Sequence, residues 1–80
     1  MHIKDAVVLR FQELCRERKI KYNDLAVRSG VTSSTVYSMM SPDRRDLSII
    51  TVKRLCDGLE ITIPEFFDCE LFENLEQEMK

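Results

Sequence analysis

This 80-residue chain is poor in the residues that hold metal ions or form disulfide bridges. It contains one histidine, His2, and three widely spaced cysteines, Cys15, Cys56 and Cys69, with no Cys-x-x-Cys pair. Structural zinc sites use about four such ligands, usually paired at short spacing, so the sequence predicts no metal site. An odd number of distant cysteines also argues against a disulfide framework.

The sequence also predicts no transmembrane segment and no signal peptide. No stretch approaches the roughly 20 apolar residues that a transmembrane helix needs. Residues 1–11 are interrupted by charge too early for a signal peptide. We therefore expect a cytoplasmic protein that does not associate with membranes.

Nothing in the sequence supports catalysis. The single histidine has no partner, and no serine or cysteine stands in a nucleophile motif. With 44% hydrophobic and 32% charged residues, the chain should form one small globular domain. A domain of this size leaves no room for a separate ligand-binding unit, so we expect no cofactor and no small-molecule ligand. Its core is small enough that a partner subunit would add stability.

The net charge of -2 conceals two regions of opposite sign. Residues 1–64 carry 11 Lys/Arg against 8 Asp/Glu, a balance of +3, whereas residues 65–80 carry 1 against 6, a balance of -5. Nucleic-acid-binding proteins usually present a basic face. The body of this chain provides one if the acidic tail lies away from it, although charge alone favours an ordinary solvated surface.

Hydrophobic spacing indicates helices throughout, and no segment reads as a strand. Val7, Phe11 and Leu14 share one helical face, which predicts a helix over about residues 3–18. The other expected helices cover residues 22–29, 33–40, 49–58, a short segment after 62, and 70–78. The predicted buried stripe of the fourth helix consists of Ile49, Val52, Leu55 and Cys56.

Capping residues define the ends of these helices. Thr32, Ser48 and Thr62 are suited to begin helices, and Glu65 completes a capping box with Thr62. For the helix over 22–29, the sequence leaves open whether Lys21 or Asn23 is the cap. Glycines end two helices: Gly30 and Gly58 stand where a positive φ is easily adopted, and Leu59 can fold back onto the turn before it.

Residues 23–41 form the stretch around which the chain is organised. Two short helices meet at the turn 29–31, with Leu25, Ala26 and Val36 facing inward. The second helix exposes a row of hydroxyl side chains: Ser33, Ser34, Thr35, Tyr37 and Ser38. Such a run forms helices poorly, and local conflicts of this kind often mark functional sites. By themselves, these residues fit either a solvated face or a surface that reads DNA.

The pattern Leu25-Ala26, Gly30-Val31-Thr32, Val36 resembles the helix-turn-helix of the Cro/CI-like (XRE) family. Residues 49–67 also resemble the end of such domains, so the likeness covers about residues 3–68. It implies an all-α, five-helix, lambda-repressor-like domain with its helix-turn-helix at 22–40. A small stand-alone bacterial or phage-type regulator of this kind binds double-stranded operator DNA, usually as a homodimer. Residues 69–80 would then form an acidic amphipathic helical tail.

The resemblance also implies which residues contact DNA. Base contacts fall on the hydroxyl row, Ser33, Ser34, Thr35, Tyr37 and Ser38. Phosphate contacts fall on Tyr22, Asn23, Thr32, Arg44 and Arg45. The recognition helix lacks the Gln, Asn and Arg that make bidentate base contacts. Recognition would therefore depend on phosphate contacts and DNA shape.

This chain departs from the family pattern at two places. The family often pairs a glutamate of the third helix with an arginine of the first, and those positions are Met40 and Cys15 here. A buried ion pair can be replaced as a unit by apolar packing. The turn after the third helix is Ser41-Pro42 rather than Asn-Gly, which leaves the path of the following arginine loop open.

Three alternatives stay open at the level of sequence. The same fold could bind a partner protein, as an antitoxin or accessory regulator does, and the weak positive charge favours this alternative. Arg44 and Arg45 could simply balance the flanking aspartates. In the tail, the apolar residues Phe72, Leu75 and Met79 fit either a dimer interface or packing on the same domain.

Overall fold

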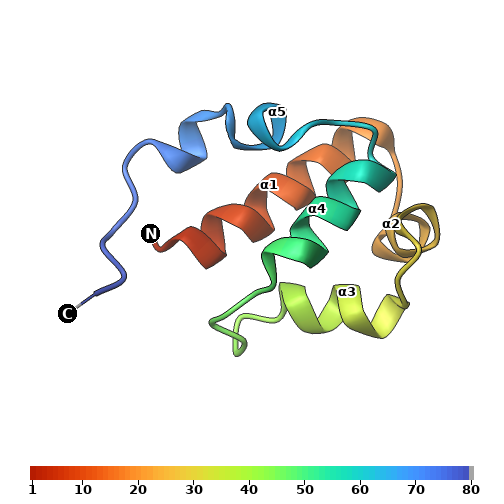
Figure 1. The fold of residues 1–80 in the computed structure, drawn as a ribbon, viewed down its shortest axis with the longest axis horizontal. Helices are drawn as coiled ribbons and strands as arrows, with labels where there is room; N and C mark the ends of the chain where they lie inside the picture. The colour runs from red at the N-terminus through yellow and green to blue at the C-terminus, as the bar shows by residue number, and fades with distance from the viewer. Residues whose placement is uncertain (80) are drawn as a thin grey trace.

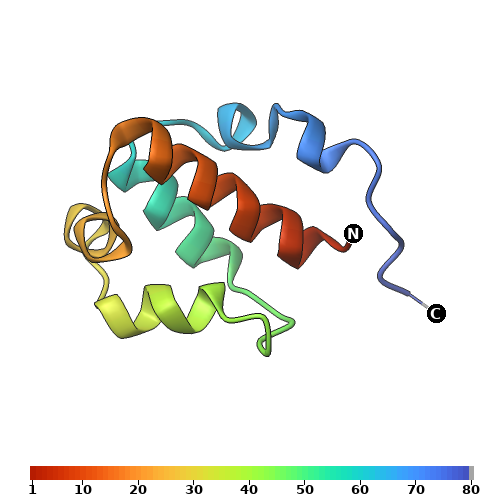
Figure 2. The same ribbon diagram turned by 180° about the vertical axis from the view of Figure 1, so that it is seen from behind.

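The computed structural model describes residues 1–79 and consists of helices, with no strand in that range (Figure 1, Figure 2). The elements are α1 Ile3–Arg18, α2 Tyr22–Ser29, α3 Ser33–Met40, α4 Ile49–Gly58, α5 Ile63–Phe67 and the 3-10 turn η1 Glu70–Phe72. Helix α2 packs against both α3 and α4, α5 packs against α4, and η1 packs against α1. The predicted all-α, five-helix class is therefore confirmed.

The predicted caps begin the helices as expected. The Thr32 hydroxyl accepts the Thr35 N–H at 3.2 Å, which starts α3. At the start of α5, the Thr62 N–H donates to the Glu65 carboxylate at 2.9 Å, and the Glu65 N–H donates to the Thr62 hydroxyl at 3.2 Å. This reciprocal capping box satisfies two N–H groups that a helix leaves unpaired.

Two further helix starts follow the same logic. The Ser48 hydroxyl accepts the Thr51 N–H at 3.3 Å, which starts α4. The N-cap of α2, which the sequence left open between two residues, is Lys21, whose backbone N–H donates to the Asp24 carboxylate at 2.9 Å.

The core is built around a stack of phenylalanines. Phe11 of α1 and Phe66 of α5 are completely buried, and their ring centroids lie 4.5 Å apart. Phe67 and Phe72 extend this group, with 4.7 Å between their ring centroids. Arg10 closes it from outside, because its guanidinium donates to the Phe66 carbonyl at 2.7 Å and thereby satisfies an end carbonyl of α5.

One residue of the predicted α4 stripe lies outside the core. Val52, Leu55 and Cys56 are completely buried, whereas Ile49 is 62% exposed. Ile49 is the first residue of α4, and at this end of the helix the predicted apolar face extends beyond the core.

The prediction of a positive φ at Gly58 is wrong. Gly58 is the last residue of α4, as predicted, but the left-handed residue after this helix is Glu60, at φ 59°. Glycine is required at position 58 for a different reason: an added Cβ would lie 2.1 Å from the Ser29 hydroxyl oxygen and 3.0 Å from the Ser29 Cα. Gly58 therefore permits the close approach of α2 and α4.

The predicted helix over residues 70–78 is limited to the single turn η1. Phe72 packs on Phe66 and Phe67, so the start of the tail packs on its own domain, while Met79 is 79% exposed. Continuing the helix would stack glutamates at i, i+3 spacing, which is unfavourable. The chain instead runs along the start of α1, where the Glu76 N–H donates to the Met1 carbonyl at 3.0 Å.

Substituting Gly58→Ala should lower the free energy of unfolding by about 1–3 kcal/mol, the usual cost of overpacking. In contrast, Ser29→Ala should be close to neutral, because the buried Ser29 hydroxyl has no hydrogen-bond partner in the described structure. Urea denaturation of both variants and the double variant measures this directly. Since the shortest contact is with the hydroxyl oxygen, Gly58→Ala should cost less in the Ser29→Ala background; equal costs would contradict the proposed clash.

Candidate nucleic-acid interface

Helix α3 is fixed to the body of the protein through α2. At the turn between them, Gly30 adopts φ 69°, and the Val31 N–H donates to the Ala26 carbonyl at 3.1 Å. Inside this angle, Leu25 and Val36 are completely buried. A turn that needs a left-handed residue and a shared apolar inner side together set the angle at which α3 leaves α2.

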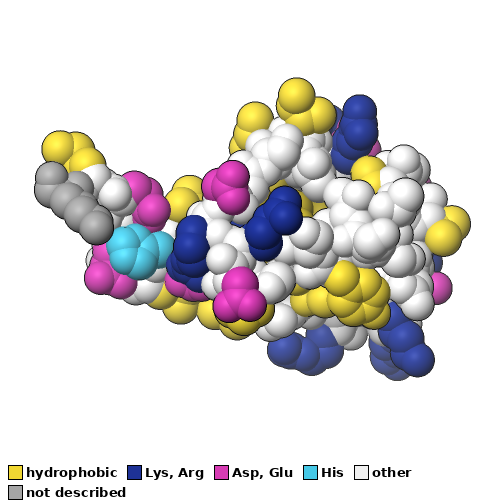
Figure 3. Space-filling view, turned by 90° about the horizontal axis from the view of Figure 1, so that it is seen from below, with side chains coloured by type: hydrophobic (Ala, Val, Ile, Leu, Met, Phe, Trp, Pro, Cys, Tyr) yellow, Lys and Arg dark blue, Asp and Glu magenta, His cyan; other side chains and the backbone are white. Residues whose placement is uncertain are grey.

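The opposite side of α3 carries the predicted hydroxyl row. Ser34, Thr35 and Tyr37 are exposed, whereas Ser33 and Ser38 are half-buried. Figure 3 looks onto the molecule from the side on which α3 lies, and much of this face is uncharged. The row therefore offers hydroxyl donors and acceptors rather than charge.

Two of the predicted contact residues lie against one another. The rings of Tyr22 at the start of α2 and Tyr37 on α3 meet edge to face, with centroids 5.4 Å apart. Tyr37 is 53% exposed, while Tyr22 packs partly into the core, and this burial raises the pKa of the Tyr22 phenol. Asn23, the next residue on α2, is exposed beside them.

The hydroxyl of Thr32 has a structural role in addition to any contact with phosphate. It accepts the Thr35 N–H as described above, and its oxygen lies 2.9 Å from the Thr35 hydroxyl oxygen. These two side chains therefore hold each other at the beginning of α3.

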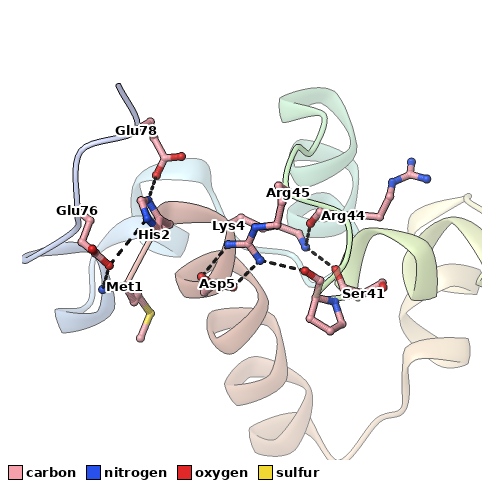
Figure 4. Close-up of polar contacts among 10 residues, drawn as sticks. Met1, His2, Lys4, Asp5, Ser41, Arg44, Arg45, Glu76 and Glu78 are labelled. Carbon is pink, nitrogen blue, oxygen red and sulfur yellow. Dashed lines mark hydrogen bonds and ion pairs between the residues drawn. The ribbon is translucent and has the colours of Figure 1, made fainter. Parts of the chain in front are cut away.

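Across from the hydroxyl row lies the segment that joins α3 to α4. A surface hollow of about 380 Å³ separates the two, and its polar lining includes Ser34, Thr35, Ser38, Arg44, Ser48 and Thr51. The side chain of Arg44 is exposed and extends away from α1 (Figure 4). The N-terminal turn of α4 is thus part of this surface, although the sequence indicated Ser48 only as a cap and gave no signal for Thr51.

A buried lysine holds the same segment in place from beneath. Lys4 is 3% exposed, and its Nζ donates to the Ser41 carbonyl at 2.9 Å and to the Arg44 carbonyl at 2.6 Å (Figure 4). Burial, together with the nearby Arg45 guanidinium, lowers the pKa of Lys4. The sequence gave no signal for this role, because its two acceptors are backbone atoms about 40 residues away.

The two loop arginines have different surroundings. Arg45 forms a two-pronged pair with Asp5, at 3.1 and 2.9 Å, and also donates to the Pro42 carbonyl at 3.1 Å. These hydrogen bonds hold the pKa of the Asp5 carboxyl below its usual range. Arg45 is thus directed toward α1, whereas Arg44 is directed toward the hollow beside α3.

The two positions that depart from the family's ion pair are both buried. Cys15 is 5% exposed and Met40 is 7% exposed, and both belong to the same core cluster. Desolvation raises the pKa of the Cys15 thiol. Both positions therefore behave as apolar packing residues.

A family model of the Cro/C1-type HTH DNA-binding domain matches residues 10–71. The chain belongs to this family. Among solved structures, the prophage Lp1 protein 11 is similar, with a TM-score of 0.80 and 25% sequence identity over 94% of this chain and 100% of that chain. No curated protein matches the sequence. The family and fold predicted from the sequence are thereby confirmed.

The family match includes the whole helix-turn-helix, α4 and α5, and it ends within η1, at residue 71. The turn η1, in which the match ends, packs on α1. Within residues 1–79, no helix is both long enough and apolar enough to cross a bilayer.

Replacing Arg45 with glutamine should raise the pKa of Asp5 toward its usual range, because the principal cause of its lowering is lost. A carboxyl with a lowered folded-state pKa stabilises the fold above its unfolded pKa and loses that contribution as the pH falls. The variant's stability should therefore fall less steeply on acidification. NMR titration of the carboxyl carbon measures the pKa, and Arg44→Gln is the matched control; an Asp5 pKa unmoved by Arg45→Gln would contradict the pairing.

Proposed function

We propose that this protein is a cytoplasmic, sequence-specific transcriptional regulator that places α3 in the major groove of operator DNA. The observation that carries the proposal is the arrangement of the helix-turn-helix, in which buried Val36 fixes the inner side of α3 and the hydroxyl row is presented outward. The major groove, about 12 Å wide, admits an α-helix. Membership of a DNA-binding family supports the same assignment.

In this proposal, one group of residues contacts bases and another contacts phosphates. Base edges are contacted by the hydroxyl row, Ser33, Ser34, Thr35, Tyr37 and Ser38. Phosphates are contacted by Tyr22, Asn23, Thr32 and the arginine loop with Arg44 and Arg45. Of the two arginines, Arg44 is the stronger phosphate contact, because the charge of Arg45 is already balanced by Asp5.

The distribution of charge is compatible with this orientation. The C-terminal tail leaves the molecule at the end away from α2 (Figure 1), and Figure 3 shows acidic side chains gathered at that end. The acidic tail therefore does not cover the outer side of α3. Because this negative segment lies away from the contact face, the mildly basic body can approach the phosphate backbone.

Short hydroxyl side chains discriminate bases weakly, so a single domain would select its site poorly. A homodimer doubles the number of contacts and requires both half-sites at a fixed spacing. Two copies that bind adjacent grooves on one side of the duplex place their α3 helices about 34 Å apart. We therefore propose a palindromic operator, with DNA shape contributing at positions that the side chains do not touch.

Selection of bound duplexes from a random pool should enrich a palindrome whose half-sites are one helical turn apart. Ser34→Ala and Ser38→Ala should each relax the preference at one base position, by about 1 kcal/mol or less, since one hydroxyl contact is weaker than a bidentate pair. Ser29→Ala provides a matched Ser→Ala control, because the Ser29 hydroxyl is buried against Gly58 of α4 and lies outside the hydroxyl row. If the wild-type protein binds no duplex even at low salt, the proposed function is wrong and a protein partner becomes the better explanation.

The substitution Arg44→Gln should weaken binding to all sequences alike and flatten the salt dependence. Each phosphate contact contributes about 0.9 to the slope of log K against log salt, so the slope should fall by about that amount. Fluorescence anisotropy with a mixed-sequence duplex measures both effects. Arg54→Gln is the control, because it removes the same charge from an exposed position on α4; equal slopes for the two variants would refute a phosphate contact by Arg44.

A further inference from the structure

We propose that Lys4 is a positioning residue for DNA binding, which holds the C-terminal end of α3 and the backbone of Arg44 without touching DNA. This inference rests on the proposed function. It concerns a residue of α1 that lies outside the helix-turn-helix and beneath the proposed contact surface.

The first argument is the way in which α3 is supported. Helix α2 packs against α3 and, through the Gly30 turn, fixes its beginning. At the other end, Ser41 is the C-cap of α3, and its carbonyl accepts the Lys4 ammonium at 2.9 Å. A cation at the C-terminus of a helix is favourable because the unpaired carbonyls carry partial negative charge. Lys4 thus fixes the second end of the recognition helix.

The second argument is the link from Lys4 to Arg44. The same Nζ donates to the Arg44 carbonyl at 2.6 Å, and the Arg44 N–H donates to the Ser41 carbonyl at 3.2 Å. Lys4 therefore bonds to both ends of this turn. The Arg44 side chain leaves the turn on the side away from α1 and lines the hollow beside α3 (Figure 4).

The neighbouring residue of α1 holds the next part of the same loop. Asp5 binds the Arg45 guanidinium with both carboxylate oxygens, and Arg45 also binds the Pro42 carbonyl. Two consecutive residues of α1 thus hold residues 41–45 from below. Lys4 is almost completely buried, so direct contact with a phosphate is not its role.

A conformationally free Arg44 would lose side-chain and backbone entropy on binding phosphate, whereas a loop that is already held loses less. Removing the Lys4 ammonium should therefore weaken DNA binding through Arg44. The effect should appear in duplexes of any sequence, because phosphate contacts carry no sequence information.

The test compares Lys4→Met with Lys53→Met, using a labelled mixed-sequence duplex at several salt concentrations. Lys53 is exposed on α4 and pairs with Asp57, so its removal changes the net charge equally without touching the loop. Lys4→Met should weaken binding at low salt by roughly threefold or more. For comparison, one phosphate contact changes the affinity by about this factor when the salt concentration changes about fourfold. Its salt slope should also fall by about 0.9, as for Arg44→Gln.

The double variant separates positioning from general destabilisation. If Lys4 acts through Arg44, then Arg44→Gln should weaken binding clearly in the wild type and hardly at all in the Lys4→Met background. Additive losses would overturn the proposal, as would a Lys4→Met variant that binds like Lys53→Met. Circular dichroism and thermal melting establish that each variant is folded at the assay temperature.

Asp5→Asn supplies a second variant in case Lys4→Met does not fold, because Asp5 lies at the surface. This change removes a negative charge, so electrostatics alone predicts tighter binding to DNA, whereas loss of loop positioning predicts weaker binding. Tighter binding would overturn the positioning role of α1. Failure of the wild-type protein to bind duplex DNA at all would instead count against the proposed function, which keeps the two conclusions distinguishable.

Discussion

The architecture depends on α2 packing against two helices at once. This helix has eight residues, a length at which an isolated helix is unstable in water, so its stability must come from its neighbours. Leu25 and Ala26 are buried on its inner side, and Gly58 lets its C-terminal end approach α4 closely. Because α3 is attached to α2 through the Gly30 turn, the contact with α4 also determines where the proposed recognition surface lies.

The chain holds α3 against the rest of the domain by apolar packing at one place and by a buried cation at another. At the positions of the family's ion pair it has buried Cys15 and Met40, which avoids the desolvation of two charges. At the end of α3 it buries Lys4, a single cation whose hydrogen bonds go to backbone carbonyls. Such a cation is tolerated there because its ammonium donates to two backbone carbonyls and the helix end is partly negative.

The outer surface of α3 is chemically mild compared with this supporting structure. Hydroxyl groups can donate hydrogen bonds to, and accept them from, several bases. In the proposed DNA complex, rigidity and phosphate contacts would therefore supply much of the affinity. The structure provides such rigidity at both ends of α3. The hydroxyls of Thr32 and Thr35 contact each other at its start, and hydrogen bonds from α1 hold the loop after it. Precise placement of weakly discriminating groups is a reasonable basis for recognition by a small domain.

The sequence by itself determined the five α-helices, the turn between α2 and α3, and the family, because these depend on local signals. The hydroxyl caps at Thr32, Ser48 and Thr62 and the glycine at position 30 act within a few residues, and apolar spacing identifies the inner face of each helix. The sequence also identified the hydroxyl row, whose outward position follows from the buried Val36.

Tertiary structure decided what depends on distant partners. It showed that Gly58 is needed for the contact with Ser29 rather than for a positive φ, and it limited the expected tail helix to η1, where Phe72 reaches the phenylalanine core. It also brought Lys4 and Asp5 beneath a loop about 40 residues away, so that Arg44 and Arg45, adjacent in the chain, face different surroundings. Backbone carbonyls and interhelical distances leave no pattern in a sequence, which is why packing alone could reveal these roles.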